Sequence, residues 1–88
     1  MNNYGKFHGI LSSDVNKFNT RVEKPAWGFR IAVEIPGADR PMTVHCMDYS
    51  GIYAACIKGD TVTIDGAVTT KKREVDGKIY HNLCLTHR

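Results

Sequence analysis

The fold of this chain is decided by residues 57–85, which read IKGDTVTIDGAVTTKKREVDGKIYHNLCL. Val62 and Ile64 alternate with polar residues, and this period of two predicts a strand with one apolar face. The strand ends in a cluster of three cations: Lys71, Lys72 and Arg73. Asp76 and Gly77 form the kind of dipeptide that most strongly indicates a hairpin turn. We therefore expect two strands joined by a long basic hairpin.

Working outward from this stretch, we expect five strands along the chain. Their ranges are residues 4–11, 26–35, 42–49, 61–73 and 79–87. The second strand has the clearest pattern, because every other residue from Trp27 to Ile35 is apolar. In the third strand, Val44 and Cys46 are expected to face the core. Polar residues fill the range 12–25, which we interpret as a connecting loop that contains an irregular strand.

A short helix is expected between the third and fourth strands, over residues 50–59. Ser50 is a candidate N-cap, and Gly59 is a candidate stop. The apolar residues of this segment have helical spacing: Ile52, Ala55 and Cys56.

This order of elements favours one fold class. Three strands, a helix and two further strands follow each other as in the OB-fold, a small and partly open barrel. We therefore predict an all-β, five-stranded OB-fold barrel with one short helix between strands 3 and 4, as a single domain over residues 1–88. An SH3-like barrel or a small sandwich would also hold five strands, and the position of the helix favours the OB-fold.

The composition is that of a globular protein, since 42% of the 88 residues are hydrophobic and 24% are charged. The net charge of +3 permits a nucleic-acid partner without requiring one. The N-terminus has no apolar leader, and no apolar run approaches the roughly 20 residues that span a membrane. With three cysteines, an odd number, we expect reduced thiols in a cytoplasmic protein, a class that includes phage and plasmid proteins acting inside a bacterium.

Part of the sequence resembles a known family. The residues that carry the likeness follow one another in this order: Lys58, Gly59, Val62, Ile64, Gly66, Thr70, Lys71, Asp76 and Gly77. They resemble the second half of bacterial-type single-stranded DNA-binding proteins, in which a short helix, a Val-x-Ile/Val-x-Gly strand, a basic arm and an Asp-Gly hairpin occur in that order. The earlier segments FHGIL, FRIAVEI and VHCMDYSGIYAACIKGD resemble the first three strands and the helix of that family.

The resemblance implies an OB-fold that binds single-stranded DNA, with RNA as an alternative ligand, without sequence specificity, in DNA replication, recombination or repair. It also implies a homodimer or homotetramer. The family usually carries a tail with an acidic tip that recruits other replication proteins. This chain stops three residues after Leu85, so we expect no acidic recruiting tail, while replication proteins are kept as candidate partners. Primosomal protein B, which acts in replication restart, is a tail-less relative of similar size.

Binding of a single strand needs cations for the phosphates and aromatic faces for the bases. The candidate residues for these contacts are Arg30, His45, Tyr49, Tyr53, Lys58, Thr69, Lys71, Lys72, Arg73, Lys78 and Tyr80. Thr69, Lys71 and Arg73 alternate, so they are expected to share one face of the arm. Tyr49 is the candidate stacking platform, whereas Trp27 and Phe29 are expected in the core. The family tends to carry a tryptophan where this chain has Arg73.

The sequence predicts no metal site, no cofactor and no enzymatic activity. The soft ligand types are present but occur in no CxxC or HxxxH pair, and His81 and Cys84 are three residues apart on a predicted strand. Cys46 and Cys56 are expected to be buried and inert. A second hypothesis is kept open: the same barrel acts as a protein–protein interaction domain or a primosome accessory protein, and the basic arm is a solvated loop.

Overall fold

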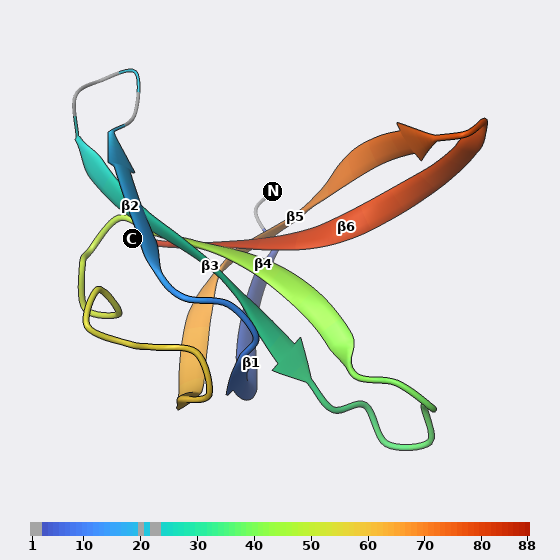
Figure 1. Cartoon of the computed structure of the whole chain (residues 1–88), viewed down its shortest axis with the longest axis horizontal. Coiled ribbons are helices and arrows are strands. Elements are labelled where there is room, and N and C mark those ends of the chain that lie inside the picture. The colour runs from blue at the N-terminus through green and yellow to red at the C-terminus, as the bar shows by residue number, and fades with distance from the viewer. Residues whose placement is uncertain (1–2, 20, 22–23) are drawn as a thin grey trace.

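The computed structural model describes residues 3–19, 21 and 24–88, and this part of the chain forms six strands (Figure 1). Their bounds are β1 Tyr4–Leu11, β2 Asn16–Asn19, β3 Pro25–Val33, β4 Met42–Asp48, β5 Thr61–Val75 and β6 Lys78–His87. All five predicted strands are confirmed. The additional strand β2 is the irregular strand expected inside the loop at 12–25.

The strands form one sheet that closes on itself. Its order is β1-β5-β6-β4-β3-β2, and an additional pairing between β1 and β3 closes the barrel. The pair β4 and β6 is parallel, and every other pair is antiparallel. A closed sheet of β1, β3, β4, β6 and β5 is the OB-fold barrel, so the predicted fold class is confirmed. Strand β2 adds to the sheet only through β3.

The core lies inside the barrel and follows the predicted alternation. Its buried members are Leu11, Phe29, Ile31, Val33, Val44, Cys46, Val62, Ile64 and Leu85. Between them along each strand stand residues that face outward, such as Arg30 on β3 and His45 on β4. Trp27 is only half-buried, and Ile35 is exposed because it lies beyond the end of β3.

Strand β5 changes partner along its length, and Gly66 lies where it does so. Residues 61–67 pair with β1, and residues 67–75 pair with β6. A Cβ atom at Gly66 would collide with the backbone carbonyl oxygen of Thr86. The missing side chain therefore lets two strands approach closely at the bend, as expected for a glycine inside a strand.

The expected helix at residues 50–59 is wrong, because this segment forms a series of turns. Among the described residues no helix is present, so none is long and apolar enough to cross a membrane. The buried carboxylate of Asp48 accepts hydrogen bonds from the backbone N–H groups of Ser50 (2.8 Å), Gly51 (3.2 Å) and Tyr53 (3.0 Å). Gly51 has a positive φ of 84°, which is incompatible with a continuous right-handed helix.

Two backbone bonds in this segment span three residues: the Ala54 N–H donates to the Gly51 carbonyl and the Cys56 N–H to the Tyr53 carbonyl. The helical spacing of Ile52, Ala55 and Cys56 does not correspond to a buried face, since Ile52 is 67% exposed. The side-chain bonding of Asp48 is stronger than the weak local preference for a helix, because a short helix gains little from propensity alone.

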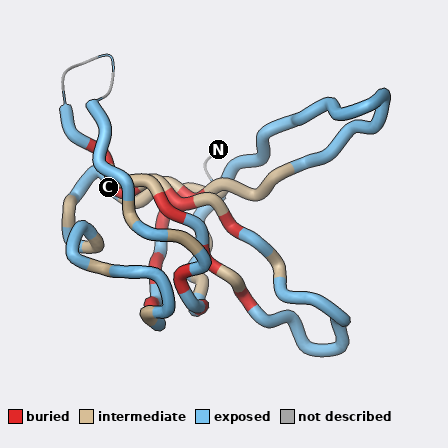
Figure 2. The backbone as a smooth tube through the Cα atoms, in the orientation of Figure 1, coloured by how far each residue is buried: buried red, intermediate tan, exposed pale blue. Residues whose placement is uncertain are grey.

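Two hairpin arms extend beyond the barrel (Figure 1). One is formed by β2 and β3, and the other by the distal parts of β5 and β6. Figure 2 shows that both arms are largely exposed, whereas burial is concentrated where the strands cross. Asp76 and Gly77 both have positive φ (51° and 77°), as a two-residue turn of type I′ requires. The predicted Asp-Gly hairpin is thus confirmed.

Candidate nucleic-acid interface

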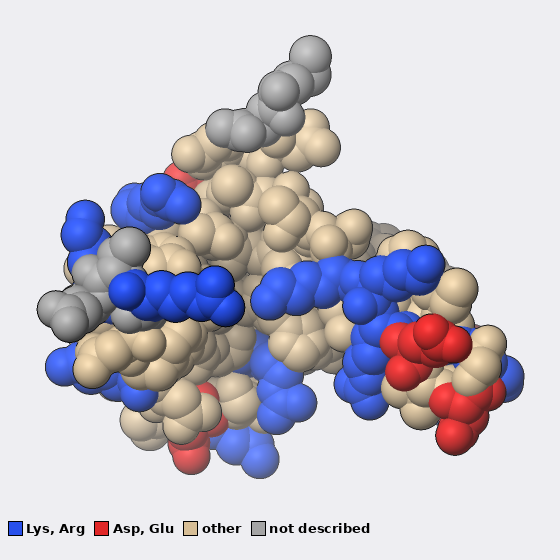
Figure 3. All heavy atoms as spheres, turned by 90° about the horizontal axis from the view of Figure 1, so that it is seen from above, with Lys and Arg blue, Asp and Glu red and all other residues tan. Residues whose placement is uncertain are grey.

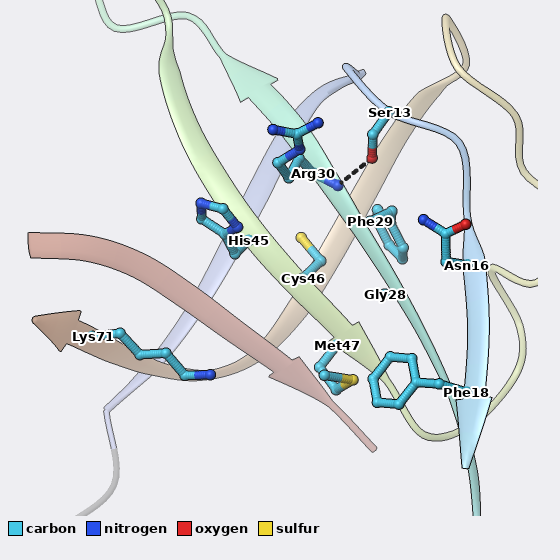
Figure 4. Close-up of a pocket in the computed structure, with 10 residues that line it drawn as sticks. All are labelled: Ser13, Asn16, Phe18, Gly28, Phe29, Arg30, His45, Cys46, Met47 and Lys71. Atoms are coloured by element: carbon cyan, nitrogen blue, oxygen red, sulfur yellow. Dashed lines mark hydrogen bonds between the residues drawn. The ribbon is translucent and has the colours of Figure 1, made fainter. Parts of the chain in front are cut away.

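A groove of about 500 Å³ lies on the outer surface of the barrel, between strand β2 and the base of the β5–β6 arm (Figure 4). Strands β3 and β4 form its floor. Its lining residues are Ser13, Asn16, Phe18, Gly28, Phe29, Arg30, His45, Cys46, Met47 and Lys71. Its size falls within the range of small-molecule binding sites.

The floor of the groove follows from strand alternation. Phe29 and Cys46 face the core, so their neighbours along β3 and β4 face outward. The register places Arg30 directly opposite His45, and Gly28 opposite Met47. The charged and polar side chains of the floor therefore stand next to each other, as cross-strand pairs do.

The loop between β1 and β2 is tied to this floor. The backbone N–H of Arg30 donates to Ser13 Oγ (2.9 Å), and the backbone N–H of Ser12 donates to the Arg30 carbonyl (2.8 Å). These two bonds hold the start of the β2 arm against β3. The loop therefore has a defined position beside the groove.

One wall of the groove carries an aromatic ring. Asn16 and Phe18 are two residues apart on β2, so they share the face that lines the groove. Phe18 is 40% exposed, and its ring lies over Gly28, where a Cβ atom would be 3.1 Å from Phe18 Cε1. The ring occupies the space that any other residue at 28 would fill.

The groove is positively charged. Its lining includes Arg30, Lys71 and His45, and none of its described lining residues is a carboxylate. Figure 3 shows Lys and Arg side chains spread across the face seen from above, acidic side chains at the end where the β5–β6 arm lies, and a few further acidic side chains near the edges of the view. Such a groove attracts anions.

The outer face of the barrel continues onto the β5–β6 arm. Cys84 pairs with His45 of β4 and with Thr69 of β5, so these three residues lie on one face. Further along the arm the same face carries the pairs Lys71 with Asn82, Arg73 with Tyr80 and Val75 with Lys78. The expected common face of Thr69, Lys71 and Arg73 is confirmed. A second hollow of about 290 Å³ lies there, lined by Arg73, Val75, Tyr80 and Asn82.

Seven of the eleven predicted residues are therefore brought onto one surface. We call this surface the basic face, and it comprises Arg30, His45, Thr69, Lys71, Arg73, Lys78 and Tyr80, together with the groove lining. Lys72 does not join it. Lys72 pairs with His81 on the opposite face of the arm, because neighbouring residues of a strand point to opposite sides.

Two predicted aromatic residues are engaged in internal contacts. The ring of Tyr53 packs on Phe29 and His87, with centroids 5.9 and 5.3 Å apart, and its hydroxyl donates to the Thr63 carbonyl (2.8 Å). Burial raises the pKa of Tyr53. Tyr49 is 39% exposed, and the guanidinium of Arg88 lies over its ring at 5.5 Å from the centroid.

Lys58 lies outside the groove lining, in the series of turns at residues 50–59, which we call the turn segment. Its backbone N–H donates to Asp14 Oδ1 (3.1 Å), and its side chain is exposed. This contact joins the turn segment to the loop before β2. The structure therefore places Lys58 next to an acidic residue and not with the cations of the basic face.

Seven of the ten lining residues were not among the predicted site residues, and Phe29 and Cys46 of these were expected in the core. The other five are Ser13, Asn16, Phe18, Gly28 and Met47. Asn16 and Phe18 lie in a polar stretch with too few apolar residues to show a period. The signal that was available is the spacing of two between them, which is typical of one strand face. It becomes informative only once β2 is known to pair with β3.

The cysteines show no sign of a reactive site. Cys46 is buried, and burial, followed by the nearby Cys84, raises the pKa of its thiol to about 12. Burial also raises the pKa of Cys56, which is half-buried. All three thiols are free, and the described residues contain no group of three metal-ligating side chains. Both shifted thiols are therefore protonated at neutral pH.

Several solved structures that superpose on this chain are single-stranded DNA-binding proteins. One from Streptomyces coelicolor superposes with a TM-score of 0.79 at 13% identity, over 96% of this chain and 87% of that protein. A mitochondrial one from S. cerevisiae gives 0.75 at 14% identity, over 100% and 91%. The Plasmodium falciparum protein, solved with single-stranded DNA, gives 0.70 at 12% identity, over 100% and 87%. No protein-family model and no curated protein matches the sequence. The chain has the fold of these proteins.

Proposed function

We propose that this chain is a member of the single-stranded DNA-binding family and binds single-stranded DNA along the basic face. One observation carries the proposal: a groove without described carboxylates continues, through paired residues, onto an arm that carries Lys71 and Arg73. The fold shared with proteins solved as single-stranded DNA-binding proteins supports it.

Binding would combine two physical effects. Cations of the groove and the arm attract phosphates, and each contact that displaces a counterion contributes about 0.7 to the slope of log affinity against log salt. Exposed aromatic rings stack on bases, which is tolerant of sequence because every base has a flat face. The protein would therefore coat or present a strand without reading its sequence, and no catalytic step is involved. We propose this role for DNA replication, recombination or repair.

We also propose that the protein forms a homodimer or homotetramer. Residues 4–9 of β1 pair with β5 on one side, and among the described residues no strand pairs with their other side. Tyr4 and Ile10 on this strand are 73% and 51% exposed. Unpaired strand edges favour association. Sedimentation equilibrium measures the mass of the particle, and a mass that stays at 9.8 kDa at all concentrations contradicts this proposal. The cytoplasmic location stays a prediction.

The function is tested by fluorescence anisotropy of a labelled oligo-dT titrated with the protein at several salt concentrations. A duplex of equal length and an oligo-U of equal length are titrated beside it. We expect binding to the DNA single strand that weakens linearly on logarithmic axes with salt, and weaker binding to the duplex, whose bases are hidden in the stack. Equal affinity for oligo-U extends the role to RNA. No binding to either single strand at low salt contradicts the proposal.

One observation favours a second function, that of a protein–protein interaction domain or primosome accessory protein. The turn segment displays two large apolar side chains, Ile52 and Ile57, which are 67% and 63% exposed. Exposed apolar residues that lie close together mark interaction sites when they form a patch. If oligonucleotides do not bind, a pull-down that compares the wild type with Ile52→Asp and Ile57→Asp tests this function.

A further inference from the structure

We propose that Phe18 of strand β2 is the base-stacking platform of the groove, and that Lys71 and Arg30 hold the phosphates of the same stretch of strand. This inference rests on the proposed function and deepens it. It assigns a nucleobase to the wall formed by β2 and an anion to the opposite side of the groove.

The first step is a census of the aromatic residues, because stacking requires an accessible ring. Four of the eight are buried or half-buried: Phe7, Trp27, Phe29 and Tyr53. Tyr49 is 39% exposed, but the guanidinium of Arg88 lies over its ring, and Tyr49 does not line the groove. Tyr4 is exposed but lies on β1, which contributes no residue to the groove. Two exposed rings remain on the basic face: Phe18 and Tyr80.

The second step is the position of the Phe18 ring. It projects from β2 into the groove, and in Figure 4 it faces Met47 of the floor. Gly28 lies beneath it, where a Cβ atom would be only 3.1 Å from the ring. The backbone of β3 thus supports one part of the ring while 40% of the residue stays accessible. A ring held in this way loses little conformational entropy when a base stacks on it.

The third step is the relation between the ring and the cations. Arg30 lies on the floor two residues beyond Gly28 on β3, and Lys71 reaches the groove from β5 (Figure 4). Apolar and cationic groups therefore occupy different parts of one groove. A nucleotide has the same division, since its base is flat and apolar on its faces and its phosphate is anionic. The arrangement suits a single strand, in which the face of a base is free to stack.

The test uses wild-type protein and the variants Phe18→Ala, Phe18→Leu and Phe18→Tyr with a labelled oligo-dT of about 16 nucleotides, the upper range of sites for one OB-fold. Loss of one stacking contact is expected to weaken binding about 5- to 150-fold in Phe18→Ala and in Phe18→Leu. The salt slope should stay unchanged, because no cation is removed. Phe18→Tyr should retain wild-type affinity. Ile52→Ala, which removes an exposed apolar side chain outside the groove, is the matched control and should bind normally.

A spectroscopic variant keeps the test informative if Phe18→Ala does not fold. Phe18→Trp adds an indole at the platform, and oligo-dT should quench its emission beyond any change seen for Trp27 in the wild type. The inference is overturned if wild type binds and Phe18→Ala or Phe18→Leu binds equally well, or if the indole is not quenched. In that case the proposed function stands. If the wild type itself does not bind, the proposed function fails, and this inference fails with it.

Discussion

At the scale of single residues, two neighbouring lysines of the arm offer a matched comparison. Lys71 lines the groove on the basic face, and Lys72 lies on the opposite face beside His81. We predict that Lys71→Gln weakens binding to oligo-dT and lowers the salt slope by about 0.7, the value for one phosphate contact. Lys72→Gln removes the same charge and should leave the slope closer to that of the wild type. Equal effects of the two variants in anisotropy titrations would mean that only net charge matters.

A stronger form of this comparison replaces both arm cations of the basic face with acids. Lys71→Glu combined with Arg73→Glu should abolish binding, because it places negative charge along the proposed phosphate path. The arm is exposed there, so the thermal midpoint of unfolding should change little. Unchanged affinity would show that the arm does not hold the strand.

Asp48 is a residue on which stability, and not binding, should depend. It is fully buried, and its carboxylate accepts bonds from three backbone N–H groups and from Ser50 Oγ (2.6 Å). Burial by itself would raise its pKa, but the hydrogen bonds from Ser50, Tyr53 and Gly51 outweigh burial and hold the pKa below the ordinary value of 3.8. The folded state therefore favours the ionised carboxylate.

The sign of the pH dependence follows. Because the folded pKa is the lower one, the stabilisation is fully present above the unfolded value of 3.8 and is lost as the pH falls through the folded value. We predict that Asp48→Asn lowers the free energy of unfolding at neutral pH, and that its difference from the wild type shrinks in acid below pH 3.8. Urea unfolding of both proteins across this pH range measures the difference in their free energies of unfolding. A difference that stays constant down to the acid limit contradicts the prediction.

At the scale of elements, strand β5 joins the barrel to the arm, and Gly66 makes its change of partner possible. We predict that Gly66→Ala destabilises the protein by about 1–3 kcal/mol or more, because its Cβ meets the backbone carbonyl of Thr86, which has no flexible end to move aside. Thermal or urea unfolding measures this change. Thr61→Ala, at an exposed position of the same strand, is the control and should change stability by less than about 0.5 kcal/mol.

The two elements that sequence patterns described least well are the turn segment and β2. The turn segment has helical apolar spacing, but a carboxylate buried in the preceding strand binds the backbone amides on which a helix would depend. Strand β2 has four residues and exposed side chains throughout, so it has no apolar face to show a period. Its conformation comes from hydrogen bonding to β3, which is a long-range property of the sheet.

At the scale of the whole molecule, the basic face has two aromatic ends. Phe18 lies on the β2–β3 arm, and Tyr80 lies on the β5–β6 arm. Tyr80 precedes Cys84 by four residues, and this spacing corresponds to about 13 Å along an extended strand. Such separated sites act independently. We predict that Phe18→Ala and Tyr80→Ala have additive effects on the free energy of binding an oligo-dT of about 16 nucleotides. On a strand of about 4 nucleotides, too short to engage both rings, the double variant should lose no more than the more damaging single variant.

Anisotropy titrations of the single and double variants with both lengths of oligo-dT test this prediction. Strong non-additivity on the long strand would mean that the two arms do not engage it independently. Loss of additivity on the short strand alone supports a path that crosses the whole basic face, from β2 through the groove to the arm.

The sequence by itself determined the barrel strands, the Asp-Gly turn and the common face of Thr69, Lys71 and Arg73. These features depend on local rules: side chains alternate along a strand, and positive φ at two successive residues favours Asp-Gly. The same alternation already separates Lys72 from Lys71. Inclusion of Lys72 among the site residues therefore came from charge alone.

Only the tertiary structure decided which side chains share the groove. Phe18 and Lys71 are far apart in sequence and meet because β2 pairs with β3 while β5 and β6 extend from the closed barrel on the other side of the groove. It also decided that Tyr53 packs internally and that the guanidinium of Arg88 lies over the ring of Tyr49. The physical reason is that accessibility and proximity depend on strand pairing across the whole sheet, and no local period carries that information.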